Sequence, residues 1–175
     1  MLSGLAAIII LIKVDVHSKE IIALLLILFG GFADLFDGYL ARKFNAVTAI
    51  GKQLDSFADL VTFGIAPVCL LHYLVSCGNK LVIIVSFLFT VAGAYRLARY
   101  NINDFNGHFM GLPITAAGII LALYAVFYAR CNSHQYPTIM TVITIIFIAT
   151  LSIAMISKIK VKRILTVRNN NPKGL

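Results

Sequence analysis

The sequence predicts an all-helical integral membrane protein with six transmembrane helices. The 175-residue chain is 60% hydrophobic and only 13% charged, with a mean hydropathy of +0.93, whereas soluble domains are about half apolar and a quarter charged. A soluble fold of this size cannot bury so much apolar surface, and disordered chains are poor in apolar residues. Long segments without charge, separated by turn-forming residues, divide the chain into helices.

The segments without charge have the length of membrane spans. About 20 apolar residues are needed to cross the hydrocarbon core as an α-helix. Asp, Glu, Lys and Arg are absent over such lengths from residues 60–79, 106–129 and 131–157. Charges interrupt two further candidates, 20–44 and 81–101, and the first run, 1–12, is short for a full crossing. Six helices follow if each of these runs is helical.

Turn-forming residues separate the predicted helices at 13–18, 78–80, 103–107 and 132–134. With six spans and the N-terminus inside, most Lys and Arg residues lie on the cytosolic side, which agrees with the positive-inside rule. A basic segment between Lys158 and Arg163 would lie on anionic lipid headgroups. We therefore expect a single membrane-embedded domain over residues 1–175, with a basic cytosolic tail from about residue 158.

Charge and cysteine content exclude several classes of protein. The net charge is +8, but the basic residues form no patch interleaved with aromatic residues, so we expect no nucleic-acid partner. A bilayer with anionic lipids, or an anionic substrate, fits this charge better. Cys69, Cys77 and Cys131 include no C-x-x-C pair, so we expect neither a disulfide framework nor a zinc site.

Four of the seven acidic residues lie between positions 34 and 59, in otherwise apolar sequence. Asp34 and Asp37 are three residues apart on the second predicted helix, and Asp55 and Asp59 are four apart on the third, so each pair shares a helix face. A short link between these helices predicts antiparallel neighbours whose acidic pairs converge toward the cytosolic side. Burying four like charges is costly unless cations compensate them.

The donor chemistry of this cluster favours Mg²⁺ or Mn²⁺, because the ligands are carboxylate oxygens without His or Cys. Four carboxylates could hold two such ions, and two-metal sites assist phosphoryl-type displacements. A cation or proton transporter also places carboxylates in the membrane. It would less naturally place four of them on adjacent helices at one membrane face.

Residues between the acids fit the same interpretation. Gly38 follows the second Asp and Gly51 is expected to open the third helix, and glycine permits close approach of a ligand or helix. Arg42 could bind a diphosphate oxygen. Taken singly, either glycine could serve helix packing and Arg42 could be a snorkelling cation; beside four acids we favour the functional interpretation.

The acidic residues and their neighbours resemble the signature of a known family. The pattern Asp-x-x-Asp-Gly-x-x-Ala-Arg over 34–42, an eight-residue spacer, and Gly-x-x-x-Asp-x-x-x-Asp over 51–59 resembles the signature of the CDP-alcohol phosphatidyltransferases at all eight positions. Segments 55–67, 95–101 and 109–115 are similar to those of the phosphatidylserine synthases within that family. The resemblance runs from Gly4 to about Arg163, although the first helix begins about a dozen residues later than is usual in the family.

The resemblance implies transfer of the phosphatidyl group of CDP-diacylglycerol to the hydroxyl of L-serine, which gives phosphatidylserine and CMP. By position in the signature, Asp59 would be the general base and would also contact a metal. The other metal ligands would be Asp34, Asp37 and Asp55. The residues lining the CDP moiety would be Gly38, Ala41, Arg42 and Gly51.

Arg96 and Arg99 are three residues apart at the predicted cytosolic end of the fourth helix, where they could bind the serine carboxylate, with a hydrogen bond from Asn101. The alternative for both is ordinary positive-inside anchoring. The resemblance further implies a homodimer in a bacterial or archaeal cell membrane, with its active site facing the cytosol at the ends of the second and third helices. A phosphatidylglycerophosphate synthase is the alternative within the family, because its phosphorylated acceptor would need the same cations.

Overall fold

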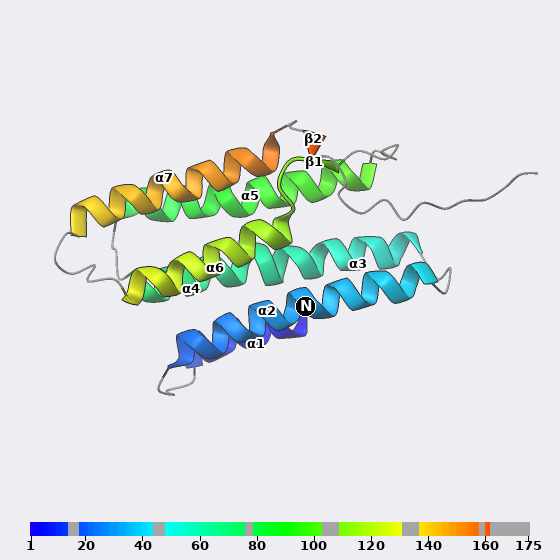
Figure 1. Ribbon diagram of the computed structural model, residues 1–175, viewed down its shortest axis with the longest axis horizontal. Coiled ribbons are helices and arrows are strands. Elements are labelled where there is room, and N and C mark those ends of the chain that lie inside the picture. The colour runs from blue at the N-terminus through cyan, green and yellow to red at the C-terminus, as the bar shows by residue number, and fades with distance from the viewer. Residues whose placement is uncertain are drawn as a thin grey trace, which may run out of the picture.

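The computed structural model describes residues 1–13, 18–43, 48–75, 79–102, 109–130, 137–157 and 160–161, and most of these are helical (Figure 1). The separate helices are α1 (Leu2–Lys13), α2 (Lys19–Lys43), α5 (Lys80–Ile102), α6 (Ile114–Arg130) and α7 (Pro137–Ile156). Between α2 and α5, α3 (Ala49–Asp59), η1 (Leu60–Ile65) and α4 (Ala66–Leu74) follow one another without a break and form one continuous rod. The described ranges therefore hold six helical segments, as the sequence predicts.

Four segments are long and apolar enough to cross a membrane: Lys19–Tyr39, Ile50–Leu74, Lys80–Asn101 and Thr138–Ile156. The other two apolar helices are shorter, with 12 residues in α1 and 17 in α6. At 1.5 Å per residue they measure about 18 Å and about 26 Å, against about 30 Å for the hydrocarbon core. The chain is an integral membrane protein with four candidate spans, and crossings by α1 and α6 stay a prediction.

The helices associate in three pairs, α1 with α2, α4 with α6, and α5 with α7, which lie side by side in Figure 1. The rod occupies the centre, because η1 and α4 also contact α1 and α2, and η1 contacts α5. Its buried side chains Phe63, Leu70 and Leu71 join the apolar core. On α6, a Cβ at Gly118 would meet the Phe63 carbonyl oxygen and would lie 2.7 Å from Phe63 Cα. Glycine at position 118 therefore lets α6 approach the backbone of η1.

The fifth predicted helix starts later than expected. The uncharged run that predicted this helix begins at residue 106, but α6 begins at Ile114, and the Pro113 carbonyl accepts the Ala117 N–H at 3.0 Å. The preceding residues form strand β1 (Phe109–Met110), which pairs antiparallel with β2 (Lys160–Val161). Gly111 has a φ of +75°, a left-handed conformation that disfavours residues with a Cβ. This backbone turn delays the helix.

Two tyrosines of α6, Tyr124 and Tyr128, pack inside the bundle. The Tyr124 hydroxyl is 2.8 Å from Thr144 Oγ1, and the Tyr124 ring stacks on Phe147 with 4.3 Å between ring centroids. Tyr128 is buried, whereas Tyr39 and Tyr73 are exposed. Of the predicted basic tail, residues 158–159 and 162–175 lie outside the described residues, as do Cys77 and Cys131.

Candidate active site

The acidic residues lie on α2 and α3, the two helices that flank the short link at residues 44–47. These helices run in opposite directions (Figure 1). Among the described residues, α2 packs on η1 and α4 more than on α3. The prediction of antiparallel helices is confirmed, but their close packing lies beyond the acidic residues, toward the core. Asp34 and Asp59 are half-buried, while Asp37 and Asp55 are exposed.

The four carboxylates form one electrostatic cluster centred on Asp34. The Asp34 side chain interacts with Asp55 by a side-chain hydrogen bond and by charge, and with Asp37 by charge. Asp59 interacts by charge with both Asp34 and Asp55. Neighbouring carboxylates that are both ionised repel each other unless a proton or a cation lies between them. The acidic pairs of α2 and α3 thus interact with each other by charge across the two helices.

The donor set of this cluster fits a hard divalent cation, since every ligand is a carboxylate oxygen. Asp34 interacts more strongly with Asp55 than with Asp37, so a bound cation would reduce the repulsion within the Asp34–Asp55 pair most. Among the described residues, however, no three Asp, Glu, His or Cys side chains stand close enough together to hold a metal ion. The chemistry of the cluster fits the metal, and its ligand groups would have to draw closer to bind one.

Gly51 lies inside the first turn of α3, so our prediction that it opens the third helix is corrected by two residues. The helix begins at Ala49 with Thr48 as its N-cap, and the Gly51 N–H donates to Thr48 Oγ1 at 3.0 Å. A Cβ at position 51 would lie 2.9 Å from the same oxygen. Gly51 thus has a local role in the cap beside any contact with CDP. Gly38 is half-buried on α2, and the side chains of Ala41 and Arg42 lie outside the described residues.

Among the described residues, Arg96 on α5 is one of two cations that interact with the acidic cluster; the other is the Met1 ammonium, which interacts by charge with Asp34 and Asp59. Arg96 interacts by charge with Asp59, although the two residues are far apart in sequence. Only 6% of Arg96 is exposed, and its guanidinium lies 4.7 Å from the centroid of the Tyr100 ring. Its Nε is buried without a hydrogen-bond partner among the described residues. A buried guanidinium with an unused donor is suited to bind an anionic group.

Arg99 is held elsewhere. Its Nη1 donates to the Ile156 carbonyl, at the last residue of α7, at 3.4 Å. The carbonyls at a helix C-terminus lack partners within the helix, so Arg99 helps to satisfy one of them. Next to it, the Leu112 N–H donates to the Ala154 carbonyl at 3.1 Å. The recorded contacts of Arg99 thus connect the ends of α5 and α7.

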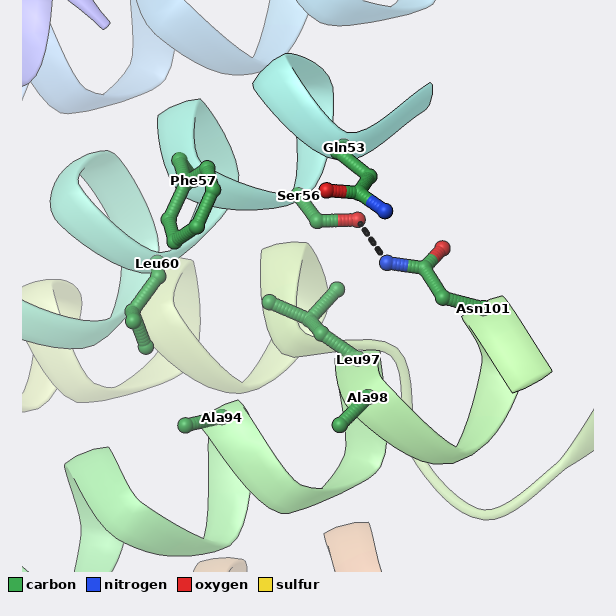
Figure 2. A pocket seen from close by; sticks show the side chains of 8 residues that line it. All are labelled: Gln53, Ser56, Phe57, Leu60, Ala94, Leu97, Ala98 and Asn101. Carbon is green, nitrogen blue, oxygen red and sulfur yellow. Dashed lines mark hydrogen bonds between the residues drawn. The ribbon is translucent and has the colours of Figure 1, made fainter. Parts of the chain in front are cut away.

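Asn101 also has a partner within the fold. Its Nδ2 donates to Ser56 Oγ at 3.0 Å, and Ser56 Oγ in turn donates to the Lys52 carbonyl at 3.1 Å. Figure 2 shows this bond spanning α3 and α5 above a small cavity of about 170 Å³. The cavity is lined by Gln53, Ser56, Phe57, Leu60, Ala94, Leu97, Ala98 and Asn101. None of the four cluster carboxylates lines this cavity, although the bond to Ser56 places Asn101 next to the residue that follows Asp55.

A second hollow, which we did not predict, lies between α2 and α6. It has a volume of about 280 Å³, and Asp34 is one of its lining residues. Gly31 and Thr115 also line it. A sequence signal existed, because Gly31 precedes Asp34 by one helical turn and Thr115 ends the third family-like segment. Nothing in the sequence indicated that these two segments face each other.

The chain is similar to known proteins over most of its length. The profile of the family described as CDP-alcohol phosphatidyltransferase matches residues 1–155. A CDP-diacylglycerol–serine O-phosphatidyltransferase from Bacillus subtilis is 38% identical over 159 residues, which cover 90% of this chain and 81% of that protein. Proteins of the same name from Methanocaldococcus jannaschii and Helicobacter pylori are 36% and 32% identical, each over 73% of this chain.

The relatives differ in how much of their own length is matched. The chain spans 57% of the Methanocaldococcus protein and 54% of the Helicobacter protein, against 81% of the Bacillus protein. The family match covers the acidic cluster, Arg96, Arg99 and all helices up to most of α7.

Proposed function

The chain belongs to the CDP-alcohol phosphatidyltransferase family, and from this premise we propose that it transfers the phosphatidyl group of CDP-diacylglycerol to the hydroxyl of L-serine. The products are phosphatidylserine and CMP. The observation that carries the proposal is the cluster of signature carboxylates that α2 and α3 bring together around Asp34. The choice of serine is supported by the printed names of three relatives at 32–38% identity.

Asp59 is proposed as the general base. A serine hydroxyl is a poor nucleophile at neutral pH, so a positioned carboxylate must accept its proton. The serine oxygen forms a bond to the phosphorus that carries diacylglycerol, the bond from that phosphorus to CMP breaks, and CMP leaves with the electron pair. Asp59 is half-buried between the acidic cluster and Arg96. This position supports its role, because a general base must lie where the serine hydroxyl meets the metal-bound donor phosphate.

Asp34, Asp37, Asp55 and Asp59 are proposed to hold Mg²⁺ or Mn²⁺. When bound, such an ion supplies positive charge that stabilises the leaving phosphate of CMP. The support is the carboxylate-only donor set and the Asp34–Asp55 contact, whose repulsion a cation would relieve. Gly38, Ala41, Arg42 and Gly51 are proposed to line the CDP moiety, on the basis of their positions in the signature.

Arg96 is proposed to bind the carboxylate of the acceptor serine. Its burial, its unused Nε and its charge interaction with Asp59 support this assignment. An arginine there would hold the acceptor carboxylate within reach of the base. The bonds of Arg99 to α7 and of Asn101 to Ser56 give these two residues roles in the fold. Of the three candidates for serine binding, Arg96 therefore has the strongest support.

The decisive experiment supplies purified protein with CDP-diacylglycerol, Mn²⁺ and one alcohol at a time. We expect CMP release to be at least tenfold faster with L-serine than with glycerol 3-phosphate or inositol. Faster release with glycerol 3-phosphate would replace the proposal with a phosphatidylglycerophosphate synthase. No CMP formation with any alcohol would return attention to a cation or proton transporter. Omission of the metal should abolish release with every acceptor.

The setting of the enzyme completes the proposal. We place it in a bacterial or archaeal cell membrane, as a homodimer, with the acidic cluster facing the cytosol. The excess of Lys and Arg on that side in the six-span arrangement supports the orientation. Cysteine accessibility in sealed vesicles tests it: a cysteine introduced at Lys43, which is exposed at the end of α2, should react only with reagents on the cytosolic side.

A further inference from the structure

Arg96 keeps a charged group almost fully inside a membrane-spanning helix. Only 6% of Arg96 is exposed, and it belongs to the candidate span Lys80–Asn101. A buried charge is costly unless neighbouring groups compensate it. Asp59 attracts Arg96 by charge, whereas Arg99, three residues along α5, repels it. Attraction between charges depends on distance and leaves the orientation of a planar group open, so other contacts must orient the guanidinium.

Tyr100 supplies such contacts. It lies four residues after Arg96 on α5, so the two side chains share a helix face. The guanidinium carbon of Arg96 lies 4.7 Å from the centroid of the Tyr100 ring, which is a cation–π contact. The two side chains also share a hydrogen bond, and because arginine can only donate, the Tyr100 hydroxyl oxygen accepts it. Tyr100 therefore contacts the guanidinium through both its ring and its hydroxyl.

These contacts leave part of the guanidinium available for a ligand. The N–H on Nε of Arg96 has no hydrogen-bond partner among the described residues. A guanidinium binds a carboxylate best through two parallel N–H bonds, which requires the plane of the group to face the carboxylate edge-on. The Tyr100 ring restricts the orientations that Arg96 can adopt, so less conformational entropy is lost when an anion binds.

The turn of α5 that carries Tyr100 is also joined to α3, the helix of the proposed base Asp59. Lys52 Nζ donates to the Tyr100 carbonyl at 3.4 Å, and Asn101 Nδ2 donates to Ser56 Oγ at 3.0 Å (Figure 2). Because two bonds and the helix itself share this task, loss of either bond alone should have a small effect. Tyr100 is thus connected to Arg96 by its side chain and to the helix of the base by its backbone.

We propose that Tyr100 is a positioning residue for the acceptor: it holds the guanidinium of Arg96 in the orientation that binds a carboxylate, and so favours serine over alcohols without a carboxylate. The inference rests on the proposed function, since it takes Arg96 to bind the acceptor. Tyr100 acts through Arg96 and needs no contact with the reacting atoms. If Tyr100 only packed the end of α5, its loss would affect every substrate alike.

The experiment compares L-serine with ethanolamine, which is serine without its carboxylate. It measures CMP release by the full-length protein in detergent micelles with CDP-diacylglycerol and Mn²⁺. For Tyr100→Leu we expect the KM for serine to rise about tenfold, from the lost ring and hydroxyl contacts. The kcat and the KM for the donor should change less than about twofold, as should kcat/KM for ethanolamine, because neither the donor nor ethanolamine uses the oriented guanidinium.

Tyr100→Phe retains the ring and removes the hydroxyl, and should raise the KM for serine only about threefold. It also decides the question if Tyr100→Leu does not fold, which thermal unfolding in detergent would reveal: an unchanged KM for serine in Tyr100→Phe would then overturn the proposal. Tyr95→Leu makes the matched change at a tyrosine of α5 that is 55% exposed, and should leave all of these constants at their wild-type values.

A double-mutant cycle identifies the residue through which Tyr100 acts. Arg96→Lys keeps the charge but lacks the planar group, so adding Tyr100→Leu to it should raise the KM for serine less than about twofold further. Independent effects of the two substitutions, or an equal loss with serine and ethanolamine, would overturn the proposal. A wild-type protein that does not use serine would contradict the proposed function itself. An active wild type beside an unchanged KM in Tyr100→Leu would overturn this inference alone.

Discussion

The two arms of the central rod, α3 and α4, differ in how far they are embedded in the protein. In α4, Ala66, Pro67, Leu70 and Leu71 are buried against the surrounding helices. In α3, none of the side chains that the structure describes is buried, and Leu54 and Phe57 are exposed together with Asp55. The free energy of folding that comes from apolar burial is therefore concentrated in α4 and η1, while α3 presents the acids.

The junction between the arms is itself unusual. A π-helix such as η1 is rare and is frequently found at functional sites, and here it follows Asp59 directly. Thr62, Phe63 and Gly64 of η1 are buried. The C-terminal end of α3 is therefore anchored in the core, although its N-terminal turns are exposed. One continuous helix thus keeps the residues that stabilise the fold apart from the residues that we propose for the reaction. Substitutions in α3 should lower activity more than stability, and substitutions at η1 should lower stability.

The largest effect is expected from Asp59→Asn. Loss of a general base costs about 10²–10⁴-fold in rate, so CMP release should fall by at least about 100-fold. The donor should still bind, as measured with radiolabelled CDP-diacylglycerol, and the thermal unfolding temperature in detergent should stay unchanged. Glu20→Gln is the control and should retain activity, because Glu20 lies in the first turn of α2, away from the acidic cluster. A fully active Asp59→Asn enzyme would remove the base assignment.

Gly118→Ala tests the close packing of α6 on η1. The added Cβ would collide with the Phe63 carbonyl, which is backbone and cannot rotate away. Overpacking of this kind costs about 1–3 kcal/mol, so we expect a clearly lower unfolding temperature by far-UV circular dichroism in detergent. Gly31→Ala, where the new Cβ makes only ordinary contacts, should keep or slightly raise the unfolding temperature. Equal behaviour of the two variants would contradict the close packing of α6 on η1.

Thr48→Ala examines the exposed arm by removing its N-cap. The lost bond from the Gly51 N–H should cost about 1 kcal/mol of local helix stability. Because α3 buries little, the first turn should fray without global unfolding, and amide hydrogen exchange in residues 49–54 should accelerate about fivefold. Thr48→Ser retains the hydroxyl and should restore wild-type exchange. Unchanged exchange in Thr48→Ala would show that the cap is not what holds this turn.

The smallest effect concerns the bond that joins the exposed arm to α5. A double-mutant cycle of Ser56→Ala and Asn101→Ala isolates the interaction between the two side chains. We expect a coupling energy of about 0.5–1.5 kcal/mol in unfolding. The KM for serine should change less than about threefold in either single variant. A larger rise in this KM for Asn101→Ala alone would reinstate Asn101 as a serine ligand.

Much of this fold could be predicted from the sequence because the relevant signals are local. Runs of apolar residues, with the turn-forming residues between them, predicted α2, α5 and α7 to within a few residues. The separations of three and four residues placed each acidic pair on one helix face. The late start of α6 was not predictable, because it depends on the left-handed Gly111 and on a strand pairing with residues more than 45 positions away.

The membrane character, the acidic pairs and the family could all be inferred from the sequence, since hydropathy and motif spacing are read along the chain. The packing of the helices sets which distant groups meet. It lets Arg96 interact by charge with Asp59 and joins Arg99 to the end of α7 by a hydrogen bond, although both arginines lie on the same helix with the same charge. It also places Thr115 beside Asp34 in one groove. Such pairings depend on how helices pack across the bundle, and no local pattern encodes them.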